Sequence, residues 1–385
     1  LGAVEGSGLT SPEPLELVRM ADKRLGLGFR FGYINSLNDA RLVAELVPQV
    51  KDPFARGSFR CALACALNLC SYYAEAEVHA VAALEEARDL RIDLVLPYAY
   101  TMLAVAFAGQ RRYEDAHHEL DLAGAASRRV TDLFGEQMVY SSRVRVLLQE
   151  GRAAYAGTVE PPDLSNALPS MRGEVLGSRG LVLASLGRFS EARALANLAS
   201  SASTGIEAMI LSYAIETLCR LNARDDDVIQ GAERLLAAGF ESGALDIVVT
   251  TYRANPDLLG VLLDSKASRE QTVYMLSRAG DDILAERILG PADEQLDPRQ
   301  RLSKREYEVY RLACEGMSNP AIAQRLFIET TTVKRHLHHI YDKLGVRSRT
   351  ALALNAARER WHQAAPATGT PIGSSSLIDS AEIPS

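Results

Sequence analysis

A short stretch near the C-terminal end of the sequence gathers side chains that can bind anions and base edges. Thr331, Lys334, Arg335, His338 and Asp342 follow one another at helical spacing, so a helix would present them on one side. Arg and Lys pair with phosphate oxygens or with guanine, Thr hydroxyls hydrogen-bond to either, and His can donate to a phosphate. The stretch therefore predicts a helix face suited to nucleic acid.

The apolar residues of the same stretch fall on the opposite side. Val333, Leu337, Ile340 and Leu344 recur at intervals of four, three and four residues, which is the pattern of a helix packed on other helices. We therefore expect a helix from about Thr331 to Lys343. For an isolated helix, a solvated basic face is the ordinary interpretation of such exposed charge.

Two helix starts precede this stretch and change that interpretation. Ser303 and Glu306 have the spacing of a capping box, and Ser318 caps a second helix with Pro320 in its first turn. A tight turn at 327–329 leads into the third helix. A short helix followed by an amphipathic helix with a cationic outer face is the geometry that enters a DNA major groove. The succession of elements favours DNA binding over a merely solvated face.

Charge is divided unevenly along the chain. Residues 299–360 contain 13 Lys and Arg against 6 Asp and Glu, a net charge of +7, whereas the whole chain carries −7. The tail from residue 361 carries −2, which leaves −12 on residues 1–298. An acidic body of this kind repels DNA and restricts contact to the basic segment.

The composition predicts helices in a chain long enough for two or three domains. Ala and Leu dominate and aromatic residues make up 6% of 385 residues; unbranched side chains lose little freedom in a helix. The five cysteines fit neither a disulfide framework nor a zinc site, so buried thiols in a reducing compartment are expected. The sequence has no apolar run long enough to span a bilayer and no signal peptide. We expect a cytoplasmic protein with no membrane partner, metal or cofactor.

Residues 60–240 repeat weakly. An apolar helix, a small residue, a basic residue and an aromatic three residues before an alanine occur around Tyr113 and again around Phe189. Equivalent alanines, at spacings of 40, 38, 38 and 40 residues, can be placed at Ala76, Ala116, Ala154, Ala192 and Ala232. Periods of this length indicate stacked helical hairpins, each of which buries its apolar face only against its neighbours.

The repeat resembles the tetratricopeptide family, in which the small residue lets two helices cross and the aromatic fills the groove beside it. The resemblance implies an all-α solenoid of helical repeats with a concave surface. An irregular all-helical domain without true repeats is the open alternative. Aromatic side chains that would either line the concave surface or pack between helices are Tyr72, Tyr100, Tyr140 and Tyr213.

The expected domains follow chain order. They are an N-terminal helical segment at 1–59, a helical-repeat sensor or interaction domain at 60–290, a linker at 291–298, a helix-turn-helix domain at 299–362 and a disordered tail at 363–385. Within the second domain, the Pro-containing stretch 157–169 predicts an inserted loop, and residues 242–290 are expected to be helical and to cap the solenoid.

Residues 302–350 closely resemble the DNA-binding domain of the LuxR family of regulators. The shared residues are Leu302-Ser-x-Arg-Glu306, Val309, Leu312, Glu315-Gly-x-Ser-Asn319, Ile322-Ala323, Leu326, Thr332-Val-Lys-x-His336, Ile340, Lys343-Leu344 and Val346-Arg347-x-Arg-Thr350. The resemblance covers about one seventh of the chain and implies a four-helix domain that reads duplex DNA with its third helix.

The same resemblance implies base- and phosphate-contacting roles for Lys334, Arg335 and His338, with Thr332 near the helix start. The expected set is Thr331, Thr332, Lys334, Arg335, His338, Lys343 and Arg349. A fourth helix, beginning after Ser348 and running through Leu354, implies a homodimer on DNA. The family usually has Ser or Thr where Glu329 stands, so we expect Thr330 to cap the third helix and to shift its start by one residue.

A helical-repeat body before such a domain also resembles the large LuxR regulators of the maltose-activator type. Those regulators carry an upstream nucleotide-binding switch domain. This sequence contains no Gly-x4-Gly-Lys-Ser/Thr loop and begins with Leu1 rather than Met, so a switch domain is expected only before Leu1. The response-regulator branch is disfavoured because its receiver domain alternates strands and helices.

Three classes of function compete. The first is a sequence-specific transcription regulator whose helical repeats sense an unknown small-molecule or protein effector. The second is an interaction scaffold whose helix-turn-helix docks a protein; the cationic stripe of Lys334, Arg335 and His338 favours DNA. The third possibility, an enzyme, is the weakest. His117 and His118 could be imagined as a metal-binding pair, but adjacent residues on a helix do not face one site. We expect no catalytic residues.

Overall fold

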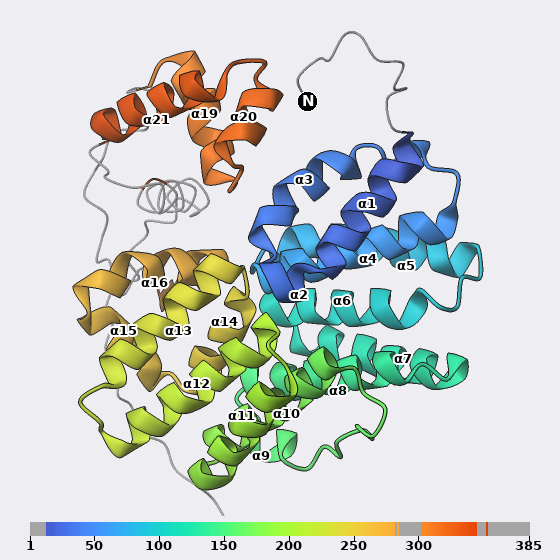
Figure 1. The fold of residues 1–385 in the computed structure, drawn as a ribbon, viewed down its shortest axis with the longest axis vertical. Coiled ribbons are helices and arrows are strands. Elements are labelled where there is room, and N and C mark those ends of the chain that lie inside the picture. The colour runs from blue at the N-terminus through green and yellow to red at the C-terminus, as the bar shows by residue number, and fades with distance from the viewer. Residues whose placement is uncertain (1–12, 282, 285–301, 345–351, 353–385) are drawn as a thin grey trace, which may run out of the picture.

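The computed structural model describes residues 13–281, 283–284, 302–344 and 352. These residues form helices and no strand, which confirms the all-α prediction, and Figure 1 shows a large helical body with a small C-terminal unit beside it. The body consists of α1 (Pro14–Gly26), α2 (Gly28–Phe31), α3 (Ile34–Ala44), the 3-10 helix η1 (Val47–Gln49), α4 (Pro53–Leu69), α5 (Tyr73–Asp89), α6 (Leu96–Gly109), α7 (Tyr113–Val130), α8 (Leu133–Gln149), α9 (Ala153–Ala156), α10 (Pro169–Ser185), α11 (Phe189–Ala202), α12 (Ile206–Ala223), α13 (Val228–Ser242), α14 (Leu245–Ala254), α15 (Asp257–Asp264) and α16 (Lys266–Arg278). The C-terminal unit consists of α19 (Lys304–Cys314), α20 (Asn319–Arg325) and α21 (Thr330–Leu344).

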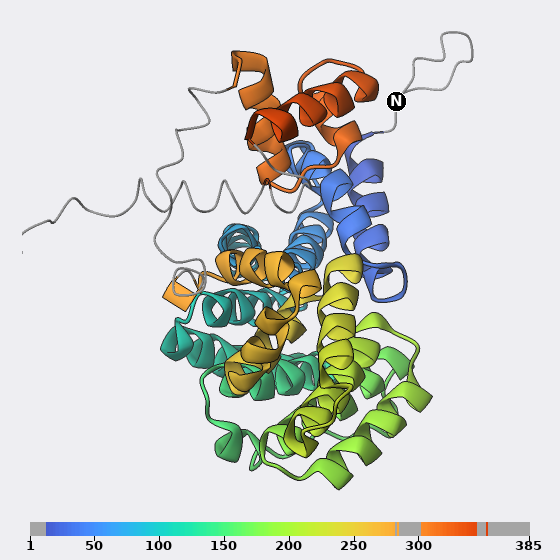
Figure 2. The same ribbon diagram turned by 90° about the vertical axis from the view of Figure 1, so that its left-hand side faces the viewer.

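One kind of turn joins the helix pairs α4–α5, α6–α7, α8–α9 and α10–α11. Two backbone N–H groups cap the helix that ends there; for example, Tyr72 N–H donates to the Leu67 carbonyl at 2.8 Å. The left-handed residues of the four turns are Ser71, Arg111, Gly151 and Gly187, with φ of 60°, 62°, 82° and 76°. The capped turn reverses the direction of the chain, so the two helices of each pair form an antiparallel hairpin. Successive hairpins stack on one another (Figure 2).

The hairpins match the predicted repeat at three of the five alanines; Ala232 is also buried, but as the fifth residue of α13. Ala76, Ala116 and Ala192 are buried, each as the fourth residue of the second helix in its pair. Ala154 is exposed, and the buried Ala156 is the fourth residue of α9. The predicted position was therefore wrong by two residues. That the hairpins are tetratricopeptide repeats stays a prediction.

α14 lies inside the body and packs against α4, α8, α12 and α13. Its nine residues Leu245–Arg253 are all buried. Tyr73 donates to Asp246 at 2.8 Å, and the Arg253 guanidinium donates to the Gly109 carbonyl at 3.0 Å. The prediction that 242–290 caps the solenoid is wrong for this helix, because burial of nearly every side chain draws α14 into the interior. α15 and α16 follow it at the edge of the body.

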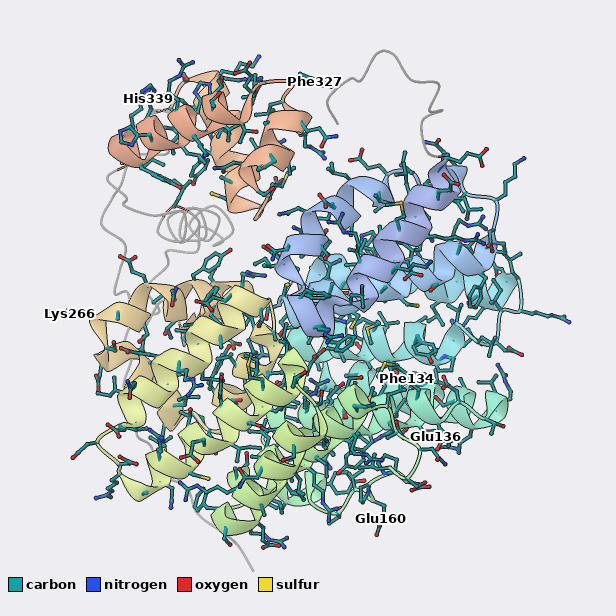
Figure 3. All side chains as sticks on the ribbon, viewed as in Figure 1. Phe134, Glu136, Glu160, Lys266, Phe327 and His339 are labelled. Atoms are coloured by element: carbon teal, nitrogen blue, oxygen red, sulfur yellow. The ribbon has the colours of Figure 1, made fainter. Side chains whose placement is uncertain are left out.

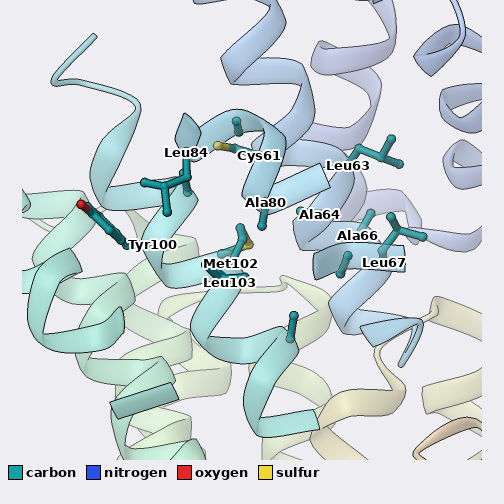
Figure 4. Packing of buried hydrophobic residues seen from close by; sticks show 14 of the residues in the cluster. Cys61, Leu63, Ala64, Ala66, Leu67, Ala80, Leu84, Tyr100, Met102 and Leu103 are labelled. Carbon is teal, nitrogen blue, oxygen red and sulfur yellow. The ribbon is translucent and has the colours of Figure 1, made fainter. Parts of the chain in front are cut away.

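Small residues bring the first helices of the body together. Ala64 of α4 and Ala80 of α5 are fully buried, and Figure 4 shows side chains of α4, α5 and α6 gathered around them. Gly109 ends α6 against the ring of Tyr73, where a Cβ would stand 2.2 Å from the ring carbons. The Ala- and Gly-rich composition therefore sets how closely the helices approach.

Several predicted features lie outside the described residues, namely the linker at 291–298, the tail at 363–385 and the fourth helix of the C-terminal unit apart from Leu352. The predicted boundary between residues 59 and 60 falls inside α4. Residues 157–168 form the loop expected before α10. No helix in the described part is both long and apolar enough to cross a membrane.

Candidate nucleic-acid interface

The C-terminal unit begins with a doubly capped helix. Ser303 Oγ accepts from the Glu306 N–H at 3.3 Å, and the Glu306 carboxylate accepts from the Ser303 N–H at 2.8 Å. This is the capping box that the sequence predicts. Val309, Leu312 and Ala313 are buried on the inward face of α19, as expected. The cap fixes where α19 starts and therefore how it meets α21.

The second helix is short and closely packed. Ser318 Oγ accepts from the Ala321 N–H at 3.4 Å, and Pro320 stands in the first turn of α20. Ile322 and Ala323 are buried against α21. The small Ala323 side chain lets the two helices cross at short range.

The third helix has the predicted inward face. Val333, Leu337, Ile340 and Leu344 are buried in the core of the unit. Burial of this stripe leaves the opposite side of α21 to solvent.

α21 starts at Thr330, one residue before the predicted start. The Glu329 carbonyl accepts from the Val333 N–H at 3.1 Å, and the Thr331 hydroxyl donates to the Glu329 carboxylate at 3.2 Å. Glu329 therefore holds the position before the helix, and the expected shift to a Thr330 cap is wrong. A negatively charged carboxylate beside the first turn interacts favourably with the helix dipole, which a neutral Ser or Thr hydroxyl does not do.

The outward face of α21 carries the predicted cations. Thr331, Lys334, Arg335 and His338 are all exposed. Within the described part of the chain, Lys334 and Arg335 form no side-chain hydrogen bond or ion pair. A phosphate could therefore approach both cations without displacing a protein carboxylate from them.

Lys343, by contrast, is held by its own domain. Its ammonium donates to both oxygens of the buried Glu306 carboxylate, at 2.9 and 2.7 Å. Burial alone would raise the pKa of Glu306, but the bonds from Lys343 and Ser303 outweigh it and lower that pKa to about 2. Lys343 thus ties α21 to α19, and the structure does not bring it together with Lys334 and Arg335 on the outward face. The sequence spacing gave no sign of this ion pair.

Two expected DNA-binding residues remain, Thr332 and Arg349. Thr332 is half-buried at the start of α21, and Arg349 lies outside the described residues. Sequence reasoning assigned Phe327 only to the turn, yet its ring is 95% exposed and its φ is 52°. Figure 3 labels Phe327 and His339 on opposite sides of the unit. Phe327 is therefore an exposed aromatic close to the start of α21 that the sequence pattern did not single out.

Residues 300–356 match the model of a known family, described as bacterial regulatory proteins, luxR family. An HTH-type transcriptional regulator of Mycobacterium tuberculosis is 51% identical over 57 residues, 15% of this chain and 6% of the relative. The transcriptional regulatory protein NarL of the same species is 38% identical over 108 residues, 26% of this chain and 50% of the relative. LiaR of Bacillus subtilis is 33% identical over 119 residues, 31% of this chain and 54% of the relative.

The chain thus spans about half, or far less, of the length of these relatives. The family match and the helices α19, α20 and α21 coincide in sequence, and the matched segment ends near the buried Leu352. The chain carries, at its C-terminal end, a helix-turn-helix domain of the LuxR family.

Proposed function

We propose that this protein is a sequence-specific DNA-binding transcription regulator. The observation that carries the proposal is the pair of exposed cations, Lys334 and Arg335, on the outward face of α21 within a LuxR-family domain. Neither cation forms an ion pair with another described residue, so both are available to a phosphate or a base edge.

α21 enters the major groove of duplex DNA with this face. Arg335 is the best candidate for a guanine, because its planar fork donates two parallel hydrogen bonds. Lys334 binds a phosphate beside this base, and the Thr331 hydroxyl donates to another once it leaves the Glu329 carboxylate. Half-buried Thr332 contributes from the first turn, and His338 continues the same face one turn further along. Lys343 stays on Glu306 and supports the helix.

The helical body supplies control. Its net charge of −12 opposes DNA and keeps contact confined to the basic domain. The stacked hairpins sense an effector, and two copies meet through the fourth helix on a roughly palindromic site. Spacing between half-sites would then follow from the two-fold axis of the dimer.

Selection from a random duplex library tests the proposal. The full chain is compared with Lys334→Ala/Arg335→Ala and with Lys304→Ala/Arg311→Ala, which removes the same charge from the exposed side of α19. We expect the wild type and the α19 variant to enrich one motif and the α21 variant to enrich none.

Either of two results would contradict this. If no variant enriches a motif and the isolated 299–362 segment also fails, the helix-turn-helix is a protein-docking module. If the α19 and α21 variants lose enrichment equally, net charge rather than the face of α21 carries the binding.

A further inference from the structure

A cavity of about 760 Å³ lies on the inner side of the helical body. The first helices of successive pairs, α4, α6, α8, α10 and α12, all contribute to its wall, and α1 and α2 cover it from the N-terminal side. Its volume falls within the range of about 300–1,000 Å³ that small-molecule pockets occupy. None of the four tyrosines considered from the sequence lines it. The tyrosines that do line it are Tyr33 and Tyr98.

Most of the wall is apolar and adaptable. Tyr98 and Phe134 stack with ring centroids 6.3 Å apart, and Figure 3 labels Phe134 near the start of α8. The other aromatic and methionine side chains of the wall are Phe29, Phe54, Met102, Met138 and Met171. Methionine side chains can adjust to a bound shape. The wall suits the apolar part of a small molecule.

One end of the cavity is polar and carries more negative than positive charge. Arg145 donates to Glu174 at 3.0 Å, and the Tyr33 hydroxyl donates to Glu207. Asp246 lies at the same end and is 2% exposed. Arg145 acts on all three carboxylates, of which Asp246 is buried and also influenced by Arg253, while Glu174 and Glu207 are partly buried.

The electrostatics of this end favour an added cation. Burial, with repulsion from Glu174, raises the pKa of Glu207 to about 7. Burial also raises the pKa of Asp246. Both shifts mean that the charged form of these carboxyls is disfavoured, and a positively charged group near Glu207 and Glu174 would favour it.

An anionic ligand fits less well. Arg145 Nη1 is buried without a hydrogen-bond partner among the described residues, so it could donate a hydrogen bond to an acceptor atom of a ligand. Its other nitrogens already donate to the Ser141 carbonyl and to Glu174. Added negative charge beside Glu174, Glu207 and Asp246 would cost more than one further bond to Arg145 returns.

We propose that this cavity binds an amphipathic small molecule whose protonated amine lies between Glu174 and Glu207 and whose apolar part packs on Tyr98, Phe134 and the methionines. That the bound amine is also the regulatory signal rests on the proposed function as a DNA-binding regulator. Binding itself does not.

Calorimetry on the full chain without DNA tests the cavity, with phenylbutylamine, phenylbutanol and phenylbutyrate as probes that differ only at the head. We expect the amine to bind at least about tenfold more tightly than the alcohol, the effect of one charged hydrogen bond, and the carboxylate to bind most weakly. Equal affinities, tighter binding of the carboxylate or no binding of any probe would overturn the proposal.

Variants locate the site. Glu207→Gln keeps an acceptor for Tyr33 but removes the charge, and it should lower the affinity for the amine about tenfold without lowering that for the alcohol. The matched control is Glu136→Gln, on α8 but outside the cavity wall, which should change neither (Figure 3). Met138→Trp should block all three probes; if it leaves the amine unaffected, the amine binds elsewhere.

The DNA readout is kept separate. If the amine binds as described but leaves the affinity for the selected duplex unchanged, the cavity stands and its role as the signal falls. If the protein enriches no DNA motif, the calorimetric result still decides the cavity.

Discussion

Two lysines of α21 have different surroundings, and the surroundings decide what each can bind. Lys334 is exposed and makes no ion pair in the described part of the chain, whereas Lys343 is committed to Glu306 at 2.7 Å. A phosphate that recruited Lys343 would leave a buried carboxylate uncompensated, which is costly. One residue type thus serves an interface at one position and the fold at another.

The salt dependence of DNA binding separates these roles. Lys334→Ala removes one phosphate contact, so the slope of log affinity against log salt should fall by about 0.9. Arg335→Ala should cost about 1–3 kcal/mol and relax the preference at one base pair. Fluorescence anisotropy on the selected duplex over a salt series measures both. A fall of the same size with Lys343→Met would contradict the assignment.

Loss of the Lys343 ammonium should instead weaken the domain. Lys343→Met should lower the stability of α19–α21 by about 2 kcal/mol, the usual worth of a hydrogen bond to a charged group. Hydrogen exchange of the α19 and α21 amides in the full chain measures this. Arg311→Met is the control, because the Arg311–Glu315 pair is exposed, with 3.6 Å between its charged atoms, and such pairs contribute at most about 1 kcal/mol.

Acid should act on the same ion pair. The pKa of Glu306 is about 2 in the folded domain and 4.5 ordinarily. Its stabilising contribution is therefore complete above pH 4.5 and is lost as the pH falls through 2. In Lys343→Met the carboxylate loses its main partner and its folded pKa moves toward 4.5, so the α19 amides should lose less protection between pH 4.5 and 2 than in the wild type. Identical acid profiles would show that Lys343 does not hold the pKa down.

The ends of a helix could be predicted where neighbouring residues supply a cap. The place of a helix within the folded protein could not. The cap at Ser303 and the start at Ser318 were correct because neighbouring residues supply the hydrogen bonds. The inward stripe of α21 followed from its period. Burial of α14 depends on partners more than 100 residues away, such as Gly109 for Arg253, and no local pattern encodes them. The Lys343–Glu306 pair escaped prediction for the same reason, at 37 residues of separation.

The approach of α5 to α6 can be tested with a matched pair of glycines. Gly109→Ala places a Cβ against the buried Tyr73 ring and should cost about 1–3 kcal/mol, as overpacking does. Gly260→Ala, in α15 with nothing within 4 Å of the added carbon, should stabilise by about 0.5–1 kcal/mol. Urea unfolding followed by circular dichroism measures both. Equal effects would mean that Gly109 is not required by packing.

The body holds together through buried polar contacts between distant segments as well as through its apolar core. Arg253 donates to Asp281 at 3.1 Å and to Gln149 at 2.7 Å, and both charged side chains are almost fully buried. Burial would raise the pKa of Asp281, but Arg253 and Arg111 outweigh it and lower the pKa. One guanidinium therefore connects α6, α8, α14 and the end of α16.

Removal of that guanidinium should affect the whole body. Arg253→Met leaves the buried Asp281 with Arg111 as its remaining cationic partner and removes the bonds to Gln149 and the α6 carbonyls, and we expect a loss of about 3 kcal/mol in the free energy of unfolding. The exposed pair Arg193–Glu216, at 3.0 Å, provides the control: Arg193→Met should cost less than about 1 kcal/mol. A small loss with Arg253→Met in urea unfolding would show that the body does not depend on this contact.

The interior position of α14 has a consequence for how the protein is made. Hairpin arrays usually need only neighbouring units and can begin to fold as each emerges. Here the hydrogen bond from Tyr73 to Asp246 cannot form until 173 further residues have been synthesised. At about 5–20 residues per second that delay is on the order of ten seconds or more. During synthesis the early hairpins therefore expose the apolar inner surface that α14 will cover, and chaperones that bind such surfaces have their opportunity in that interval.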